Sequence, residues 1–195
     1  MSEVMTAANH ASEETGGISR RRVVAGVAWS LPVIVTAVAA PAAASASGVS
    51  ATVSFVGSAT TFYKAGGGGG GTERTGAGPT GFQIQNSGGA ITGAISGTIN
   101  ITPEGTVTAG IGVQSISQAS VSAPSYSATH ASTGSFTYSL GIPAGGTASF
   151  PIQFQYAAAN GIPNKVTYSY VMTMTVTLPD GSSQVLPGVR LSVTF

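Results

Sequence analysis

Four side chains after residue 46 could take part in acid, base or nucleophilic chemistry, namely His130, Asp180, Glu73 and Glu104. A serine hydrolase needs a histidine and a carboxylate held beside an activated serine, and a glycosidase needs two carboxyl groups at a fixed separation. Each of the four lies in a stretch of glycine, serine, alanine or proline, which is typical of turns and loops. We interpret them as turn residues, and we expect no catalytic residue and no enzyme activity.

The segment Asn86-Ser87-Gly88-Gly89 places a serine before two glycines, an order that also occurs around the nucleophile of some serine proteases. No glycine precedes Ser87, and the chain is short for a protease of two barrels. We interpret Asn86 as the end of a strand and Gly88 and Gly89 as its turn. A secreted hydrolase therefore ranks third among the functions considered.

Metal, phosphate and nucleic-acid sites lack the residues they need. Zinc requires several histidine or cysteine ligands and calcium requires clustered carboxylates, but the chain has no cysteine and its acids are scattered. The glycines at 66–71 are not followed by the Gly-Lys-Ser/Thr of a phosphate loop. A net charge of +1 offers no basic excess for phosphates. We expect no metal, no cofactor and no nucleic-acid partner.

A basic and then apolar segment near the N-terminus predicts an export signal over residues 1–46. Arg20, Arg21 and Arg22 precede an uncharged apolar run over residues 23–40. The order Ser-Arg-Arg-x-apolar-apolar resembles the twin-arginine signature, with Val-Val in place of the usual Phe-Leu pair. We expect an export translocase to be the first partner, through either the twin-arginine or the general route.

The end of this segment indicates cleavage. Its small residues give the small-x-small pattern of a signal peptidase site, with Ala44 or Ala46 before the cut. Pro32 and the many alanines make the run a weak membrane helix. We expect a secreted or cell-surface protein that meets the membrane only transiently. The alternative is an uncleaved anchor with the domain outside, because the arginines hold the N-terminus inside.

Alternating side chains predict an all-β domain over residues 47–195. From 166 to 178 the even positions are apolar and the odd positions are mostly threonine, which indicates a strand with one buried face. Residues 148–156 repeat the pattern, and Pro151 on their polar side fits an edge strand or a bulge. Between Val113 and Ile116 the parity switches, which predicts a bulge at Gln114 and Ser115. Further alternating runs occupy 82–84, 95–101, 107–113, 136–140 and 189–195.

Turn sequences separate these runs. Residues 102–106 (Thr-Pro-Glu-Gly-Thr) and 178–183 (Leu-Pro-Asp-Gly-Ser-Ser) predict the turns of two hairpins. The fold expected is an antiparallel two-sheet sandwich of eight or nine strands, and a closed barrel is the alternative. Residues 65–81 and 118–134 have no period and are rich in small residues, so we expect surface loops.

Aromatic side chains could instead form a platform for sugars. Most of them share the apolar parity of their strands and are therefore assigned to the core. These are Tyr138, Phe150, Phe154, Tyr156, Tyr168 and Tyr170. The only tryptophan, Trp29, lies in the predicted signal. Phe62, Tyr63 and Tyr126, beside or within the predicted loops, are the contact candidates.

Two segments carry a resemblance to a known class of domain. Residues 82–93 (FQIQNSGGAITG) and 140–154 (LGIPAGGTASFPIQF) resemble immunoglobulin-like modules of bacterial, actinobacterial-type exported proteins. The resemblance covers about residues 82–195, and it implies a scaffold without a shared active site. The function expected is a non-catalytic surface or secreted module with a structural, adhesive or interaction role. The alternative is a secreted protein that binds carbohydrate or a small ligand. Envelope polysaccharide or a surface protein is the expected partner.

Overall fold

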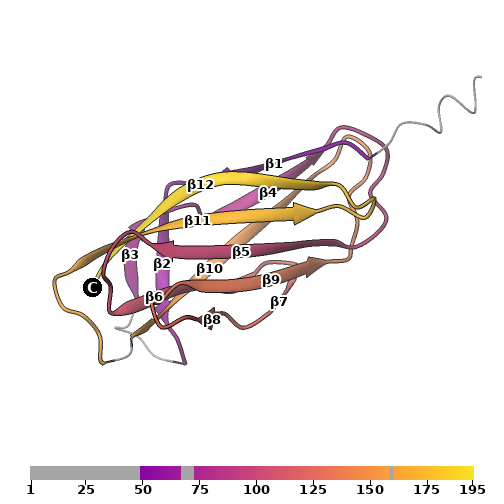
Figure 1. The fold of residues 1–195 in the computed structure, drawn as a ribbon. Coiled ribbons are helices and arrows are strands. Elements are labelled where there is room, and N and C mark those ends of the chain that lie inside the picture. Colours follow the sequence, from indigo (N-terminus) through magenta and orange to yellow (C-terminus); the bar gives the residue numbers. More distant parts are fainter. Residues whose placement is uncertain (1–48, 67–72, 159) are drawn as a thin grey trace, which may run out of the picture. The chain divides into compact units, whose positions relative to one another are not determined.

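The computed structural model describes residues 49–66, 73–158 and 160–195, and this part is all-β, with no helix among these residues (Figure 1). Its strands are β1 (Ala51–Val56), β2 (Ala59–Lys64), β3 (Arg74–Ala77), β4 (Gly81–Asn86), β5 (Ile95–Pro103), β6 (Ala109–Ile116), β7 (Ser120–Val121), β8 (Ser125–Tyr126), β9 (Ser132–Tyr138), β10 (Thr147–Ala158), β11 (Thr167–Thr177) and β12 (Ser183–Thr194). The predicted export signal, with Arg20, Arg21, Arg22, Ala44 and Ala46, lies outside the described residues.

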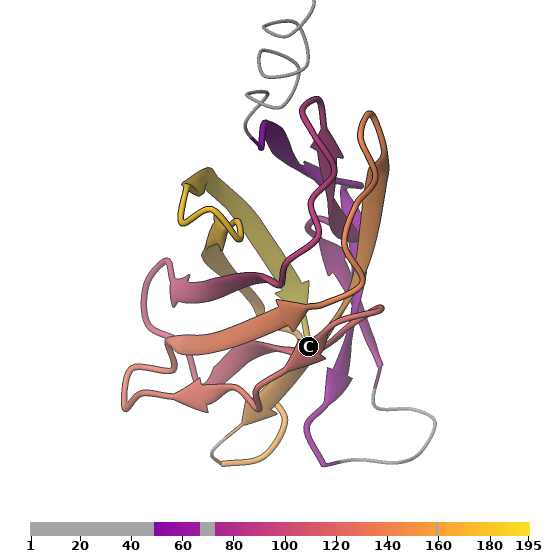
Figure 2. The same ribbon diagram turned by 90° about the vertical axis from the view of Figure 1, so that its right-hand side faces the viewer.

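Hydrogen bonding joins the strands into one mixed sheet. The order is β1-β4-β10-β2-β3-β12-β11-β5-β9-β7, with β6 also paired to β10 and β8 to β9. Figure 2 shows β12, β11, β5 and β9 on one side of the domain and β1, β4 and β10 on the other. The sheet therefore curls so that its buried side chains meet between these two groups of strands.

Strand β10 changes partners halfway along its length, and Pro151 marks the change. Residues 147–151 pair with β4, whereas the strand pairs with β6 from Ile152 onward. Beside Pro151, the Ile152 N–H donates to the carbonyl of Thr80, and the Pro151 carbonyl accepts from Ser117. Residues 147–151 are paired on one side only, so this half of β10 is an edge as predicted, and Pro151 is tolerated because β6 joins the other side only from Ile152 onward.

One pair of strands contradicts the antiparallel prediction, because β2 runs parallel to β10. Strand β1 is antiparallel to β4, which is antiparallel to β10, so β1 already runs in the direction of β10. Only Gly57 and Ser58 separate β1 from β2, and Gly57 has a φ of 80°. The chain steps sideways there without reversing, so β2 meets the second half of β10 in parallel.

The predicted bulge near Gln114 is confirmed. Ser115 pairs with Gln153 and Val113 with Phe154, so Gln114 is the extra residue on β6. A second register shift, between Met172 and Met174 of β11, was not predicted from the sequence. There the facing strand β12 passes through Pro187 and Gly188, which explains the shift because proline lacks a ladder donor.

The two predicted hairpins have different outcomes. Residues 178–183 join β11 to β12, which pair antiparallel as expected. Residues 102–106 lead from β5 to β6, but these strands do not pair: β5 pairs with β11 and β9, and β6 pairs with β10. That prediction was wrong because both edges of β5 are already occupied, so the turn carries the chain to a different part of the sheet.

Both predicted loops contain strands. The described part of 65–81 includes β3, which pairs with β2 and β12, and its last residue, Gly81, begins β4. The segment 118–134 contains β7, β8 and the start of β9. The predictions failed because these strands join the sheet through backbone hydrogen bonds, which small side chains without a period do not reveal.

Side-chain parity predicted the core correctly over most strands. Along β11, Tyr170, Met172, Met174 and Val176 are at most 1 % exposed. The aromatic residues assigned to the core are buried, apart from Tyr168, which is half-buried. The assignment to the core was wrong at the ends of two predicted runs. Leu140 is 77 % and Val166 39 % exposed, because each lies just beyond the end of its strand.

An aromatic cluster forms the centre of this core. The ring of Phe82 on β4 stacks on Phe150 of β10 at 4.7 Å between centroids, and it lies 5.3 Å from Phe136 of β9. Tyr138 of β9 meets Phe150 edge-on at 4.9 Å. These rings join β9 to β4 and β10 across the core.

Asn86 fixes the loops next to this cluster. It ends β4 and is fully buried. Its Nδ2 donates to the carbonyls of Gly89, Ile142 and Pro143 at 2.8, 3.3 and 3.0 Å, and its Oδ1 accepts from Gly88 N–H at 3.1 Å. The predicted end of a strand and its turn are confirmed, and one amide links two loops distant in the sequence.

Candidate functional site

Asp180 and Glu104, two of the acids considered for catalysis, each have a local structural partner. Both Ser182 N–H and Ser182 Oγ donate to Asp180 Oδ1, and these bonds lower the pKa of the carboxyl group. A lowered pKa in the folded state means that this contribution to stability is present above the unfolded pKa and is lost as the pH falls through the folded one. Glu104 Oε2 lies 2.8 Å from Nε of Arg190, in an ion pair open to solvent.

His130 lies in a third, separate turn. It has a φ of 63°, and its N–H donates to the carbonyl of Ser127. Ser127 in turn accepts from Ala131 N–H through its Oγ. No group of three or more metal-ligating side chains occurs within the described ranges. His130, Asp180 and Glu104 thus lie in three turns of different parts of the sheet, and Glu73 precedes β3.

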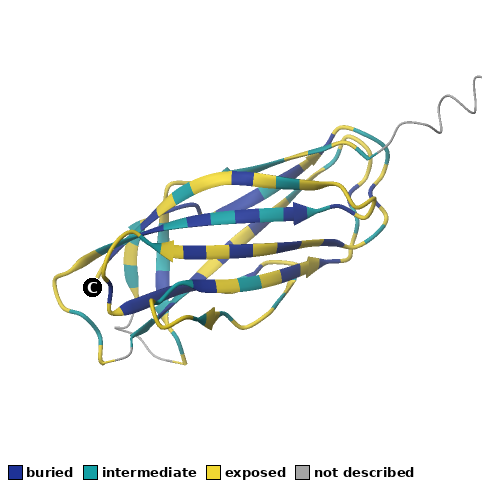
Figure 3. Cartoon of the chain, viewed as in Figure 1, coloured by how far each residue is buried: buried dark blue, intermediate teal, exposed yellow. Residues whose placement is uncertain are grey.

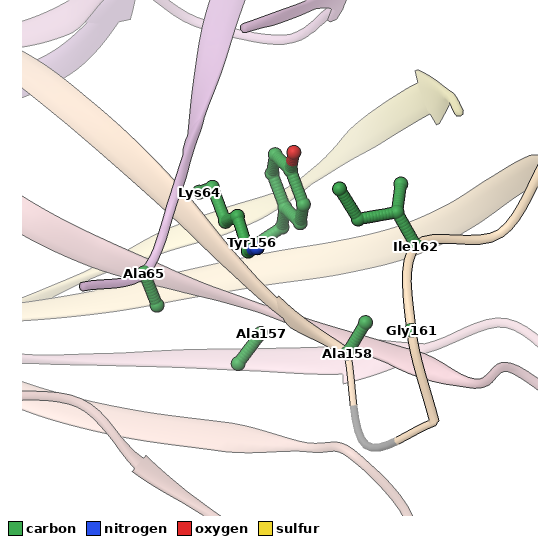
Figure 4. A pocket seen from close by; sticks show the side chains of 7 residues that line it. All are labelled: Lys64, Ala65, Tyr156, Ala157, Ala158, Gly161 and Ile162. Atoms are coloured by element: carbon green, nitrogen blue, oxygen red, sulfur yellow. The ribbon is translucent and has the colours of Figure 1, made fainter. Parts of the chain in front are cut away.

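A pocket of about 510 Å³ lies where the ends of β2 and β10 meet the loop after β10 (Figure 4). Its lining combines three alanines and a glycine with three larger side chains, those of Lys64, Tyr156 and Ile162. Figure 4 shows the Tyr156 ring between Lys64 and Ile162. The volume is in the range of small-ligand sites, and the lining combines apolar surface with one amine.

A second depression, of about 430 Å³, adjoins the first through Ala157 and Ala158. Tyr126 and His130 are part of its wall. The turn that carries His130 therefore lies beside the end of β10, and its depression shares Ala157 and Ala158 with the pocket that contains Lys64.

The contact candidates from the sequence have different environments. Phe62 is fully buried and its ring lies 5.5 Å from that of Phe154, so its assignment as a contact residue was wrong. It forms part of the core because β2 is an interior strand. Tyr63, its neighbour on the opposite face, is half-buried. Tyr126 is half-buried too, and its hydroxyl accepts from Gln155 Nε2 at 3.3 Å.

Tyr126 holds the 118–131 segment against β6. A Cβ atom built on Gly110 would come within 2.6 Å of the Tyr126 ring, and one on Gly112 would come within 2.6 Å of Pro124. Two glycines in this strand thus let the tyrosine and the proline lie directly on its backbone. Burial raises the pKa of Tyr126, and the bond from Gln155 lowers it by less. Glycine at alternate positions of a predicted strand was the sequence signal for this close approach.

The substitution Gly112→Ala is expected to detach this segment. The new methyl group overlaps Pro124 and Tyr126, so we expect a loss of about 1 to 3 kcal/mol in the free energy of unfolding and a fall in the pKa of Tyr126. Urea denaturation and NMR titration of the tyrosine ring measure both. Gly134→Ala is the matched control, since its methyl group would have no neighbour closer than 3.9 Å. Equal destabilisation of the two variants would contradict the role given to Tyr126.

The outward side of β12, β11, β5 and β9 carries a regular array of hydroxyl groups, called here the hydroxyl face. Its members are Ser96, Thr98, Thr102, Thr133, Ser135, Thr137, Thr173, Thr175, Thr177 and Ser183. Figure 3 shows buried and solvent-accessible residues alternating along these strands. In one row Thr98 is paired to Thr175 on one side and to Ser135 on the other. None of these ten side chains is charged, and the same outward side also carries Asn100, Val171, Val185 and Arg190.

The spacing of the array follows from sheet geometry. Rows repeat at about 6.6 Å along a strand and columns at about 4.8 Å between strands. A shallow depression of about 280 Å³ lies within it, lined by Ser96, Thr98, Ser135 and Thr175 among others. Six of the ten residues lay in predicted runs, namely Ser96, Thr98, Thr137, Thr173, Thr175 and Thr177. Thr102 and Ser183 were placed in turns, Thr133 in the loop over 118–134, and Ser135 lies between that loop and the run over 136–140.

The comparisons with known proteins assign no family to the chain. No protein-family model matches the chain, and no curated protein is significantly similar to it. In the part of the chain that the structure describes, no helix is long and apolar enough to cross a membrane.

Proposed function

We propose that this protein is an exported, non-catalytic module that acts at the cell surface or as a secreted protein, in a structural or adhesive role. In this proposal the curled sheet is the two-layer sandwich of an immunoglobulin-like domain of bacterial exported proteins. Its partner is an uncharged polysaccharide of the cell envelope. The single observation that carries the proposal is the hydroxyl face.

The chemistry of this face favours a neutral, hydroxyl-rich partner. Ten uncharged hydroxyl side chains lie on four neighbouring strands at fixed spacings. Some already bond one another, as Thr177 and Ser183 do at 2.9 Å. A single such bond adds little in water, so affinity would come from many bonds made together along a repeating polymer. Arg190 of β12, opposite Val171 on the same outward side, is paired with Glu104, and the ten hydroxyl positions themselves carry no charge to attract a charged partner.

The binding test places one charge in the centre of the face. Thr98→Glu is expected to weaken binding to insoluble, uncharged envelope polysaccharide at least tenfold, because an interface would have to desolvate the carboxylate. Thr147→Glu, at an exposed position of β10, is the matched control and should bind as the parent does. Co-sedimentation measures both affinities, and circular dichroism checks the fold. Undiminished binding by Thr98→Glu would contradict the proposal.

Export is the second part of the proposal and has its own test. Replacing Arg20, Arg21 and Arg22 by lysine is expected to block a twin-arginine route, because that receptor reads the guanidinium pair rather than net charge. Unchanged secretion would assign the general route. The N-terminus of the exported protein should be Ser45 or Ser47. Finding Met1 or Ser2 on membrane-bound protein would establish the anchor instead.

The pocket of about 510 Å³ favours a second candidate function, the binding of a small apolar anion. Its alanine-rich wall suits an apolar body, and Lys64 at its edge suits an acidic group. Anilinonaphthalene sulfonate is a suitable probe, and its fluorescence should rise on binding. Lys64→Gln should weaken that binding, and an unchanged affinity would contradict this candidate.

A further inference from the structure

The loop between β10 and β11 contains an asparagine followed by a glycine. Asn160 and Gly161 come shortly after the end of β10, and they form the one Asn-Gly pair of the sequence. Glycine has no side chain to shield its backbone nitrogen, so that nitrogen can approach the side-chain amide carbon of the residue before it. An asparagine in this position can therefore lose its amide group through a reaction with its own backbone.

The structure leaves the Asn160 side chain unrestrained. Asn160 is exposed, and within the described ranges no hydrogen bond holds its side-chain amide. Gly161 has a φ of 91°, and a Cβ atom built on it would meet nothing within 4 Å. Exposed loop positions with few contacts change conformation at little cost in free energy. Asn160 can thus adopt the conformation in which its Cγ atom meets the Gly161 nitrogen.

Asn86 is the contrasting case in the same fold. Ser87 follows it, and serine is also a small residue that leaves its backbone nitrogen accessible in an unfolded chain. In the folded protein Asn86 is fully buried and its amide makes four hydrogen bonds. The Ser87 N–H, which would have to attack, donates to the carbonyl of Ser50 at 2.7 Å. The fold therefore holds both reacting groups of Asn86 and leaves the side chain of Asn160 free.

We propose that Asn160 is a self-modification site, at which the side chain cyclises onto the Gly161 nitrogen in the folded protein and is then converted by water to aspartate or isoaspartate. Hydroxide removes the proton of the Gly161 N–H, and the nitrogen forms a bond to Asn160 Cγ. The Cγ–Nδ2 bond breaks, and Nδ2 leaves as ammonia after taking a proton from water. This step returns the hydroxide and leaves a five-membered succinimide ring.

The second step opens this ring. Water adds to one of its two carbonyl carbons, and the bond from that carbon to the ring nitrogen breaks. Attack at the side-chain carbonyl gives aspartate, and attack at the backbone carbonyl gives isoaspartate. The two steps together consume one water and release one ammonia. They need no oxidant, no cofactor and no enzyme.

The product carries a new charge beside the pocket of about 510 Å³. Gly161 and Ile162 line this pocket on the side across from Lys64, as Figure 4 shows. An acid at position 160 lies one residue before that lining. The reaction replaces a neutral amide by a carboxylate, so the formal net charge of the chain falls from +1 to zero. The charge next to the pocket thus changes with the time that has passed since folding.

This inference goes beyond the proposed function and does not depend on it. The hydroxyl face lies on β12, β11, β5 and β9, whereas Asn160 is in the loop after β10. Loss of polysaccharide binding in Thr98→Glu would leave the reaction at Asn160 unchanged. The two proposals can therefore fail separately.

The test keeps the folded full chain in water enriched in heavy oxygen and then locates the new carboxyl group by mass spectrometry. Chymotrypsin releases residues 157–168, which contain Asn160 and, as an internal control, Asn164. We expect heavy oxygen to enter at Asn160 at least tenfold faster than at Asn86, because Asn86 must first break its hydrogen bonds. The rate at Asn160 should rise from pH 6 to pH 8, since the attacking nitrogen has to lose its proton.

Two variants separate the effect of the sequence from that of the fold. Ser87→Gly gives Asn86 the same following residue as Asn160. In the folded variant Asn86 should still react at least tenfold more slowly than Asn160, whereas in urea the two should react within about twofold of each other, because unfolding removes the protection. Asn160→Gln is the control and should take up no heavy oxygen at position 160, since the longer side chain would have to form a larger ring.

Two results would overturn the proposal. One is a folded chain in which Asn160 takes up no heavy oxygen over the time in which the urea-unfolded chain reacts there. The other is folded Ser87→Gly protein in which Asn86 and Asn160 react at equal rates, because the fold would then not select the site. Circular dichroism checks that Ser87→Gly is folded.

Discussion

Phe82→Ala is expected to lower the free energy of unfolding by about 4 kcal/mol. The ring is fully buried on β4 and contacts Phe150 and Phe136 at 4.7 and 5.3 Å between centroids. Removal of the ring leaves a cavity between β4, β10 and β9, and β4 has no second aromatic side chain to fill it. Neighbours held by ladders on both sides cannot close such a space. Most single domains have only about 5 to 15 kcal/mol of stability, so the variant would lose a large share.

Urea denaturation followed by tyrosine fluorescence measures this loss as a lower midpoint at unchanged slope. Phe55→Ala is the matched control, because Phe55 is the cross-strand partner of Phe82 but is only partly buried. We expect it to cost about 1 kcal/mol, in proportion to the smaller apolar area that it buries. Equal losses in the two variants would show that the cluster is not the centre of the core.

Asn86→Asp should destabilise the fold by about 3 to 5 kcal/mol at pH 7. The two side chains have nearly the same shape, so the change is one of hydrogen-bond polarity. The amide donates to Gly89, Ile142 and Pro143, whereas a carboxylate would place negative charge against those three carbonyls. The site is fully buried, so water cannot compensate.

The loss in Asn86→Asp should depend on pH. Burial and the facing carbonyls raise the pKa of the new carboxyl in the folded state above the ordinary value of about 3.9. Below the unfolded pKa both states are protonated and the loss is smallest, and it grows as the pH rises toward the folded pKa. Thermal unfolding at pH 3.5 and pH 7, with the parent protein measured at both, tests this. Asn100→Asp, at an exposed position of β5, is the control, and a similar pH dependence there would contradict the argument.

The sequence predicted which residues are buried better than it predicted how strands pair. Alternation along residues 166–178 fixes a face, because side chains point to opposite sides with a period of two. The same pattern contains no information on the neighbouring strand or its direction. The parallel pairing of β2 with β10 depends on the step at Gly57, and the separation of β5 from β6 depends on the other partners of β5. These are properties of the whole sheet rather than of any one segment.

The candidate sites show the same division. The hydroxyl face is the polar half of the predicted alternation, so its residues on β11 and, apart from Thr102, on β5 could be named from the sequence. The hydrogen bonds that protect Asn86 could not, because Ile142 and Pro143 lie 56 and 57 positions further along the chain. Phe62 was misassigned since the short strand β2, beside a run of glycines, gave too few alternating residues to indicate a core position.

The position of β12 has a consequence for the order in which the fold can form. This strand, the most C-terminal of those described, lies inside the sheet between β11 and β3. Until residues 183–194 have left the ribosome, β3 and β11 each lack one of their two ladder partners, and the hydrogen-bonded path of the sheet is interrupted between them. The strands on either side can pair earlier, but the two halves of the strand order are joined only when β12 is in place. The many partners distant in sequence place folding in the slow, millisecond-to-second class of β proteins.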